Sequence, residues 1–385
     1  MSEIALQTYG GGTPKTANEE FWKGNIPWIQ SSDLIEEQLF NVKPRKYISQ
    51  EAISKSATKL VPQNSIAIVT RVGVGKLAFM PFSYATSQDF LSLSDLKIEP
   101  EFAVYALYKM MQLVSNEVQG TSIKGITKDE LLAKEILIPG CEEQKKIGAY
   151  LHNLDHLITL HQRKCDEIKS LKKYMLQKMF PQNEQKVPEI RFKGFTEAWE
   201  QRKLDDWGNF YYGRSCPKWS VTEDATIPCI RYGELYTKFG AKIDRVYSYT
   251  NMPPENLRFS KGTEVLIPRV GEDPMDYNHC TWLSMQDVAI GEMISVFNTD
   301  NNPLFTATMF NATLQNEFAM RVEGGSVTNL YFEKLKNIEV SFPSIPEQEK
   351  IASYFENLDH LITLHQQKCE ELKKIKKFML QKMFV

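Results

Sequence analysis

The 385-residue sequence lacks long apolar runs, paired cysteines and a marked net charge. No stretch approaches the roughly 18 apolar residues that cross a bilayer, and the opening residues MSEIALQTYGGGTPK lack the basic and apolar regions of a signal peptide. We therefore expect a cytoplasmic protein that does not enter a membrane. The six cysteines include no Cys-x-x-Cys pair, which argues against structural zinc and disulfides.

The formal net charge of −2 gives no overall electrostatic sign of nucleic-acid binding. Residues 181–346 are more acidic, with 22 acidic and 17 basic side chains and hence a net charge of about −5. A subunit that is held on DNA within a larger complex needs only local basic patches, because other subunits share the phosphate contacts. Charge therefore leaves DNA binding open.

Sequence signatures of catalysis are also missing. The segment RVGVGK at 71–76 resembles a phosphate-binding loop, but Leu77 follows the lysine where that loop requires Ser or Thr. We interpret it as a turn between strands with a basic tip. The segment NMPP at 251–254 departs from the Asn-Pro-Pro-aromatic motif of amino-methylating enzymes at Met252, and we interpret it as a surface turn. Because there is no glycine-rich cofactor fingerprint and no nucleophile elbow, we expect no catalytic residue, metal site or cofactor in this chain.

One decapeptide, NLDHLITLHQ, is present twice, at 153–162 and at 357–366. Shifting the chain by 204 residues aligns 143–180 with 347–384, and 27 of these 38 positions are identical. Weaker similarity continues upstream, from 122–139 to 326–343. The sequence therefore contains an internal duplication.

Each copy of the repeat has the pattern of a long helix. Apolar residues recur three and four positions apart over about five heptads, as at the a and d positions of a coiled coil. The predicted helices cover 142–180 and 346–385, and each is roughly 57 Å long at about 1.5 Å per residue. Polar residues at four seam positions, His161, Lys172, His365 and Lys376, are expected to fix the pairing register. The predicted seam residues are Ile147, Leu151, Leu154, Ile158, His161 and Cys165 in the first helix, and Ile351, Phe355, Leu358, Ile362, His365 and Cys369 in the second.

The rest of the chain forms two globular parts of the α+β class. Strand-like runs such as 65–69 and 263–267 alternate with turn signals such as GGGTP at 10–14, and 100–116 is predicted to be a helix. We place the first domain at 1–141 and the second at 205–345, with a linker and leader at 181–204. Two short segments match between the domains: IPWIQSSDL at 26–34 with IPCIRYGEL at 227–235, and Arg71-Val72-Gly73 with Arg269-Val270-Gly271.

Polar and basic residues in predicted loops of both domains are candidates for reading DNA. Arg, Lys, Asn and Gln are the main side chains that hydrogen bond to base edges, with Ser and Thr as adaptable partners. For each residue alone, a solvated surface is the alternative. Arg71 and Arg269 are the strongest candidates, because the residues around them match in the two domains. The full set is Thr13, Lys15, Gln30, Arg71, Lys76, Ser122 and Lys124 in the first domain, and Lys218, Arg231, Arg269, Asn278 and Ser326 in the second.

Several segments resemble those of one known family. They are EQKKI at 143–147, PEQEKIA at 346–352, PEIRF at 188–192, WEQRKL at 199–204 and GGTP at 11–14. Together with two diverged domains, each followed by a nearly identical helix, these segments make the chain similar to the specificity subunit of type I restriction-modification systems over nearly its whole length.

This resemblance implies a non-catalytic subunit with two target recognition domains, each of which reads one half of a bipartite, asymmetric sequence in double-stranded DNA. It also implies that the two helices pair as an antiparallel coiled coil with internal pseudo-twofold symmetry. The paired helices, through these partner-docking and coiled-coil residues, would set the gap between half-sites and dock two methyltransferase subunits, since two similar helices offer two similar surfaces. Two restriction subunits would join the complex. S-adenosylmethionine, and ATP with Mg²⁺, would be bound by these partners.

The leader at 187–203 has no counterpart of the same length before the first domain, so we expect an N-terminally shortened or recombined gene product. A hypothesis from another class is a coiled-coil adaptor that joins two proteins without touching DNA, and the acidic second half favours it. Two large, diverged domains on a nearly invariant frame favour a sequence reader instead.

Overall fold

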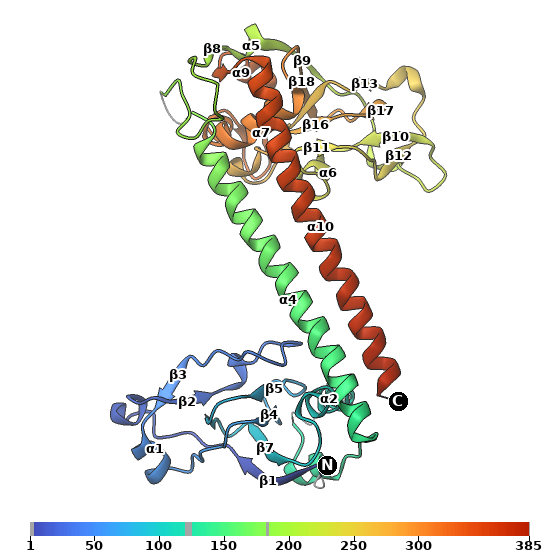
Figure 1. Ribbon diagram of the computed structural model, residues 1–385. Coiled ribbons are helices and arrows are strands. Elements are labelled where there is room, and N and C mark those ends of the chain that lie inside the picture. Colours follow the sequence, from blue (N-terminus) through green and yellow to red (C-terminus); the bar gives the residue numbers. More distant parts are fainter. Residues whose placement is uncertain (1–3, 120–124, 182–184, 385) are drawn as a thin grey trace. The chain divides into compact units, whose positions relative to one another are not determined.

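The computed structural model describes residues 4–119, 125–181 and 185–384 and divides the chain into two compact units (Figure 1). The first unit comprises Met1–Gln162 with Gln366–Val385, and the second comprises Arg163–His365. Each unit therefore contains one globular domain and a part of both long helices, α4 (Cys141–Lys178) and α10 (Ile345–Met383). None of the helices within the described ranges is long and apolar enough to cross a membrane.

The first domain is built on an antiparallel four-stranded sheet in the order β1-β7-β4-β5, with a second sheet in the order β3-β2-β6. All five residues of the SIAIV run in β4 are buried, as expected for a central strand. The strands are β1 (Ala5–Gly10), β2 (Ile26–Ile29), β3 (Lys46–Ile48), β4 (Ser65–Val69), β5 (Leu77–Met80), β6 (Ala85–Thr86) and β7 (Phe90–Leu96). The helices are α1 (Gln50–Lys55), α2 (Pro100–Gln119) and α3 (Lys128–Ala133), with 3-10 turns at Glu19–Trp22 and Ser31–Asp33.

Helix α2 connects the first sheet to the long helices. Pro100 opens α2, a position where its missing N–H needs no partner. Phe102 of α2 belongs to the same buried cluster as Ile66 of β4, Leu151 of α4 and Leu372 of α10. The first domain and its helix segments therefore share one hydrophobic core, and the predicted strand at 65–69 and helix from residue 100 are confirmed.

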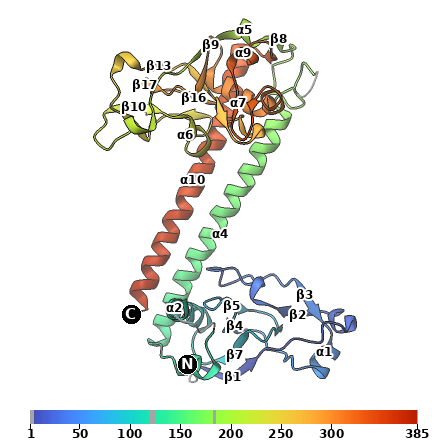
Figure 2. The same cartoon turned by 180° about the vertical axis from the view of Figure 1, so that it is seen from behind.

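The second domain repeats this plan with additional strands, seen from the other side in Figure 2. Five strands form a sheet in the order β11-β16-β14-β18-β9, four form a sheet in the order β12-β10-β17-β13, and the two small sheets are β15-β20-β19 and β21-β8. The strands are β8 (Glu200–Lys203), β9 (Gly208–Tyr212), β10 (Ile227–Ile230), β11 (Lys242–Ile243), β12 (Ser248–Thr250), β13 (Phe259–Lys261), β14 (Glu264–Pro268), β15 (Val270–Gly271), β16 (Thr281–Leu283), β17 (Gln286–Ile290), β18 (Ile294–Thr299), β19 (Glu323–Gly324), β20 (Thr328–Asn329) and β21 (Glu339–Phe342). The helices are α5 (Leu204–Trp207), α6 (Tyr232–Thr237), α7 (Pro303–Thr313), α8 (Gln315–Ala319) and α9 (Phe332–Leu335), with 3-10 turns at Lys218–Ser220, Pro254–Asn256 and Pro274–Asp276.

The two domains share one strand topology although their sequences have diverged. Strand β2 pairs antiparallel with β3 and parallel with β6, and β10 pairs antiparallel with β12 and parallel with β17. The neighbours β1-β7-β4-β5 correspond in the same way to β9-β18-β14-β16. The expected α+β architecture, with two related domains that each lead into a long helix, is thereby confirmed.

A hydrogen bond explains why an acidic residue recurs in the two similar sequence segments, 26–34 and 227–235. After β2, the carboxylate of Asp33 accepts a hydrogen bond of 3.0 Å from the backbone N–H of Gln30, and after β10, Glu234 accepts one of 2.9 Å from Arg231. Both acidic residues are buried. Each satisfies an N–H at the start of a helical turn, which explains why an acid recurs at this position.

A close backbone approach explains a glycine in each domain. A Cβ atom on Gly11 would lie 1.8 Å from the carbonyl oxygen of Ser87, and one on Gly213 would lie 2.0 Å from that of Gly291. No other residue fits at either position. The loops that follow β1 and β9 therefore leave their sheets at equivalent points.

Helices α4 and α10 run antiparallel within each unit. In the first unit, Nζ of Lys376 lies 2.5 Å from a carboxylate oxygen of Asp155, and the thiol of Cys369 donates to the carbonyl oxygen of Ile158 at 3.3 Å. The higher-numbered residue of α10 thus faces the lower-numbered residue of α4. The second unit repeats both contacts, between Lys172 and Asp359 at 2.5 Å and between Cys165 and Ile362 at 4.0 Å. Both predicted seam lysines therefore pair across the two helices.

Candidate nucleic-acid interface

The predicted DNA-reading residues differ in their exposure. Five are exposed, namely Thr13, Lys15, Arg71, Lys218 and Ser326. Five more are half-buried, namely Gln30, Lys76, Arg231, Arg269 and Asn278. Ser122 and Lys124 lie outside the described residues. Exposure alone therefore leaves five of the described candidates fully accessible to a ligand.

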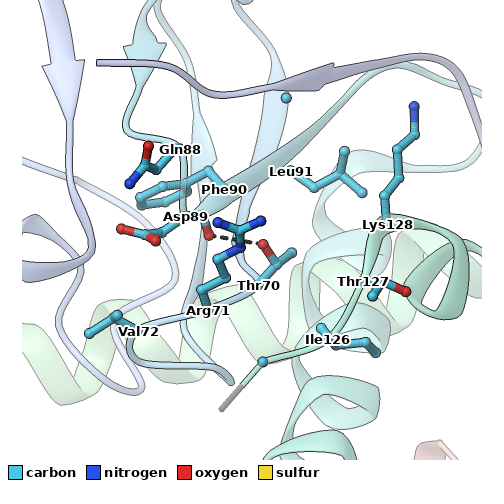
Figure 3. A pocket seen from close by; sticks show the side chains of 12 residues that line it. Thr70, Arg71, Val72, Gln88, Asp89, Phe90, Leu91, Ile126, Thr127 and Lys128 are labelled. Carbon is cyan, nitrogen blue, oxygen red and sulfur yellow. Dashed lines mark hydrogen bonds between the residues drawn. The ribbon is translucent and has the colours of Figure 1, made fainter. Parts of the chain in front are cut away.

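Arg71 stands in the turn between β4 and β5, beside a cavity of about 600 Å³. This position agrees with the interpretation of 71–76 as a turn between strands. Figure 3 shows the side chain of Arg71 rising into the space between Asp89 and Leu91. Lys128 also lines the cavity. Within the described residues the guanidinium has no hydrogen-bond partner, so it is available to a phosphate or a base edge.

The sequence match between Arg71 and Arg269 does not follow the backbone register. The carbonyl of Thr70 accepts a hydrogen bond of 2.8 Å from the N–H of Ile126. The carbonyl of Arg269 accepts a bond of the same length from Leu330, which is 204 residues beyond Ile126. Arg269 therefore occupies the position of Thr70, and the equivalence predicted from the Arg-Val-Gly match is wrong by one residue.

The half-buried side chain of Arg269 packs against neighbouring residues of the second domain. Its guanidinium lies over the rings of Tyr212 and Tyr331, 4.8 and 5.7 Å from their centres. One terminal nitrogen donates to the carbonyl oxygen of Glu292 at 3.3 Å, and the other lies 3.6 Å from the sulfur of Met293. These contacts make Arg269 a packing residue at the edge of its sheet. Contact between Arg269 and a base stays a prediction.

Two residues at the cavity of the first domain have larger counterparts in the second. Gly10 pairs with Leu91, and in the corresponding strands Tyr212 pairs with Ser295, so Tyr212 stands where the first domain has glycine. Arg269 likewise stands where the first domain has Thr70. The equivalent edges of the two sheets therefore present different surfaces, a cavity bordered by Arg71 and Lys128 in one domain and a stack of Tyr and Arg side chains in the other.

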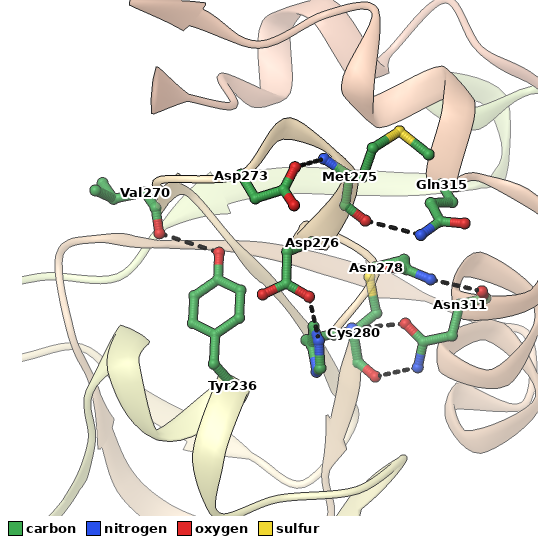
Figure 4. A network of polar contacts seen from close by, with 10 residues as sticks. Tyr236, Val270, Asp273, Met275, Asp276, Asn278, Cys280, Asn311 and Gln315 are labelled. Atoms are coloured by element: carbon green, nitrogen blue, oxygen red, sulfur yellow. Dashed lines mark hydrogen bonds and ion pairs between the residues drawn. The ribbon is translucent and has the colours of Figure 1, made fainter. Parts of the chain in front are cut away.

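Two further candidates have structural partners. Nζ of Lys76 donates to the carbonyl oxygen of Leu34 at 3.0 Å, which ties the turn after β4 to the segment after β2. The side-chain amide of Asn278 donates to the carbonyl oxygen of Asn311 at 3.2 Å. Figure 4 shows Asn278 within a network of polar contacts that also joins Asn311 to Cys280. Both side chains therefore stabilise loops, whether or not they also meet DNA.

Sequence reasoning missed an exposed aromatic residue beside one candidate. Trp219 follows Lys218 in a short 3-10 turn, and its side chain is 72% exposed. Arg214 is exposed in the same connection between β9 and β10. Aromatic rings next to basic side chains suit stacking on bases and contact with phosphates. The Pro-Lys-Trp sequence at 217–219 was the available signal.

The predicted seam residues of the helices are largely covered. Most of them are buried, namely Ile147, Leu151, Leu154, Cys165, Ile351, Phe355, Leu358 and Cys369. The others, Ile158, His161, Ile362 and His365, are half-buried. This burial agrees with a role in pairing the helices, and contact of these residues with a partner subunit stays a prediction.

A different set of helix residues is exposed and apolar. Three such residues of the first unit, Leu157, Ile375 and Phe378, have exposed apolar counterparts in the second, Leu361, Leu171 and Tyr174. These two sets correspond member by member at the offset of 204 residues. Each unit therefore exposes apolar side chains at the same three helix positions, here called its apolar patch, and the recurrence of apolar residues outside the seam in both copies of the repeat was the signal in the sequence.

Metal chemistry finds no support in the part of the chain that the structure describes. There, no group of three or more His, Cys, Asp or Glu side chains could hold a metal ion. All six cysteines are free thiols.

Two segments of the chain, residues 3–170 and 196–374, match the family described as type I restriction modification DNA specificity domain. The chain belongs to this family. Each match covers one globular domain and most of the helix that follows it. The duplication seen in the sequence is therefore a duplication of the family's domain.

Several members of the family resemble the chain over all or part of its length. The type I restriction enzyme MjaIX specificity subunit from Methanocaldococcus jannaschii is 24% identical over 400 residues, which cover 97% of this chain and 89% of that protein. The EcoR124I/EcoR124II specificity subunit from Escherichia coli is 31% identical over 160 residues, 39% of this chain and 38% of that protein. The solved S subunit of the type I restriction-modification system from M. genitalium has a TM-score of 0.57 at 16% identity, covers 100% of this chain and 94% of that one, and supports the fold.

Family membership confirms the resemblance drawn from the sequence and assigns the chain to DNA target recognition in type I restriction-modification. The adaptor without DNA contact is not favoured. Which side chains read the bases stays a prediction.

Proposed function

We propose that this protein is a non-catalytic specificity subunit, acting in the cytoplasm, whose two domains each read one half of a bipartite, asymmetric site in double-stranded DNA. The recognition domains would correspond to 1–141 and 205–345, with a linker and leader at 181–204 and the paired helices at 142–180 and 346–385. The observation that carries the proposal is the pair of domains with one topology and different side chains at equivalent positions, such as Thr70 and Arg269. Two domains that share a topology but present different side chains suit the recognition of two different half-sites.

The matched apolar patches support a second part of the proposal, the docking of two methyltransferase subunits. Because Leu157, Ile375 and Phe378 recur as Leu361, Leu171 and Tyr174, one kind of partner can bind twice. The methyltransferase subunits would supply the binding site for S-adenosylmethionine. Two restriction subunits would supply the site for ATP and Mg²⁺.

Docking at these patches is tested by charge substitution. Leu157→Asp or Leu361→Asp alone should reduce the bound methyltransferase subunits from two to one, and the double variant should bind none, because a carboxylate placed in an apolar contact loses hydration. Native mass spectrometry of the co-expressed complex measures the stoichiometry. Gln367→Asp, at an exposed helix position outside the patches, is the control. Full stoichiometry in the double variant would contradict this docking site.

Recognition is tested by expressing the chain with the methyltransferase subunit of its own system and sequencing the host genome for N6-methyladenine. One gapped, two-part motif is expected. A continuous motif, or methylation without sequence preference in an assembled complex, would contradict recognition by two separate domains.

A further inference from the structure

Two aromatic rings cover the seam ion pair of the first unit. Nζ of Lys376, which pairs with Asp155, lies 5.6 Å from the ring centre of Tyr105. It lies 5.9 Å from the ring centre of Tyr108. The phenol of Tyr105 donates a hydrogen bond of 2.6 Å to Asp155, at a carboxylate oxygen other than the one that Lys376 binds. Both tyrosine side chains are buried, so the rings shield the ion pair from water.

The helix that carries these rings, α2, corresponds to α7 of the second unit. Both helices open with proline, Pro100 in α2 and Pro303 in α7. The residue before each proline donates its backbone N–H to a glutamine of the long helix, Gln144 at 3.0 Å and Gln348 at 2.9 Å. The two helices therefore start at equivalent points, and their residues can be compared at an offset of 203.

The two tyrosines are replaced by smaller residues in α7. Thr308 stands at the position of Tyr105, and Asn311 stands at the position of Tyr108. The hydroxyl of Thr308 donates to a carbonyl oxygen one turn earlier in its own helix, at 2.7 Å. The side-chain amide of Asn311 forms two hydrogen bonds of 2.7 Å with the backbone of Cys280 (Figure 4). Neither residue supplies an aromatic ring to the seam.

The seam ion pair of the second unit is more exposed than that of the first. The side chain of Lys172 is 25% exposed, against 9% for Lys376. That of Asp359 is 38% exposed, against 21% for Asp155. Lys172 binds one carboxylate oxygen of Asp359 at 2.5 Å, and the other oxygen accepts no hydrogen bond from any described residue. This pair therefore offers an acceptor where the pair of the first unit binds a phenol.

A cavity of about 160 Å³ lies beside Lys172. Thr308 and Asn311, the counterparts of the two tyrosines, both line this cavity. Apolar side chains complete part of the wall, namely Leu176, Leu235 and Phe239. A cavity of about 150 Å³ is large enough to bind benzene. The second unit thus has room for one aromatic ring beside the lysine that corresponds to Lys376.

We propose that this cavity is a binding site for one phenolic ring, either of a free phenol or of a tyrosine side chain from a partner protein. The ring would contact the ammonium group of Lys172, as the ring of Tyr105 contacts Lys376. The hydroxyl would donate to the free carboxylate oxygen of Asp359, as Tyr105 donates to Asp155. The side chains of the first unit therefore indicate the chemistry of the ligand.

The proposal is tested by titrating the full-length chain with 4-fluorophenol, followed by fluorine NMR. Saturable binding of one molecule per chain is expected. Fluorobenzene, which lacks the hydroxyl, should bind roughly tenfold more weakly, because it cannot donate a hydrogen bond to a carboxylate. Absence of saturable binding would overturn the proposal. Equal affinity for the two compounds would overturn recognition of a phenol.

Two substitutions place the binding in this cavity. Thr308→Tyr puts the ring of the first unit into the cavity and should abolish binding of 4-fluorophenol. Lys172→Met removes the cation and should weaken binding roughly threefold or more. Lys173→Met, at an exposed position of the same helix, is the matched control and should leave the affinity unchanged.

Circular dichroism checks that each variant is folded. Lys172→Met keeps the test decisive if Thr308→Tyr does not fold, because the ion pair of Lys172 is partly exposed and its loss costs little stability. Unchanged affinity in Lys172→Met, or in a folded Thr308→Tyr, would overturn the proposal.

The source of the ring is distinguished by repeating the titration on the chain in complex with the methyltransferase subunit of its own system. Loss of 4-fluorophenol binding in the complex would assign the site to a tyrosine side chain of that subunit. Unchanged binding would assign it to a free phenol. Both results support a site for a phenolic ring.

Discussion

Arg71 and Arg269 look alike in the sequence but have different surroundings. Arg71→Ala should leave the free energy of unfolding unchanged and weaken DNA binding by about 1–3 kcal/mol, because the exposed guanidinium is free to contact DNA.

Arg269→Ala should lower the free energy of unfolding by about 1–2 kcal/mol, because Tyr212 and Tyr331 lose the cation that packs against their rings. Urea unfolding and DNA titration separate the two effects. If the Arg269→Ala variant kept full stability but recognised a different half-site sequence, Arg269 would be assigned to base contact instead of packing.

Tyr212 makes the same sheet edge sensitive to alkaline pH. Burial raises the pKa of its phenol to about 12, and the hydrogen bond of 2.7 Å to Glu333 adds to the shift. Because the pKa is raised in the folded state, the stabilisation is complete below the ordinary pKa of about 10 and is lost as pH rises through about 12. Tyr212→Phe should therefore unfold with a weaker dependence on pH in this window. The difference between the tyrosinate absorbance titrations of the two proteins measures the pKa, and a midpoint near 10 would contradict it.

The sequence predicted the exposure of some candidate DNA-binding residues, but it did not predict which candidates have hydrogen-bond partners inside the protein. Lys15 and Lys218 are exposed beside the predicted turns, because Pro and Gly specify such loops locally. Lys76, Asn278 and Arg269 were chosen by the same reasoning, yet their polar groups are partly used by carbonyl oxygens far away in the chain. Such partners depend on tertiary packing, which local patterns do not contain.

At the scale of elements, the two seam ion pairs differ in burial. The side chain of Lys376 is 9% exposed, and its partner Asp155 also accepts a hydrogen bond of 2.6 Å from Tyr105. Asp155→Asn should therefore lower the free energy of unfolding by about 3–5 kcal/mol, since it leaves a buried cation unpaired. Asp359→Asn, at the more exposed pair with Lys172, should cost about 1 kcal/mol or less. Equal losses in urea unfolding would mean that burial does not determine the strength of these pairs.

The long helices were predictable and the strand registers were not. Residues 142–180 and 346–385 were expected to be helical, and the helices span Cys141–Lys178 and Ile345–Met383, because a repeated heptad pattern specifies both period and length. The Arg-Val-Gly match, in contrast, was off by one residue. A register shift of one residue turns a side chain to the other face of the sheet, and only the hydrogen bonds between strands determine it.

At the scale of the whole molecule, we attribute the gap between the half-sites to the paired helices. Inserting one heptad after Leu160 and another after Leu364 keeps the spacing of the seam residues, because seven residues preserve the a and d pattern. Each helix then gains about 10.5 Å, which corresponds to about three base pairs of roughly 3.4 Å each. Methylome sequencing should show a longer gap with both half-sites unchanged. Altered half-sites with an unchanged gap would contradict this role.

The seam contacts also bear on how such a chain can arise. Each half of the sequence contributes one lysine and one aspartate, and each lysine pairs with the aspartate of the other half. Two copies of either half alone would therefore form the same two ion pairs, as a homodimer with a self-complementary interface. Such a homodimer would carry two identical readers and would recognise a palindrome. Joining two unlike halves in one chain exchanges that palindromic target for an asymmetric one while both ion pairs of the seam are kept.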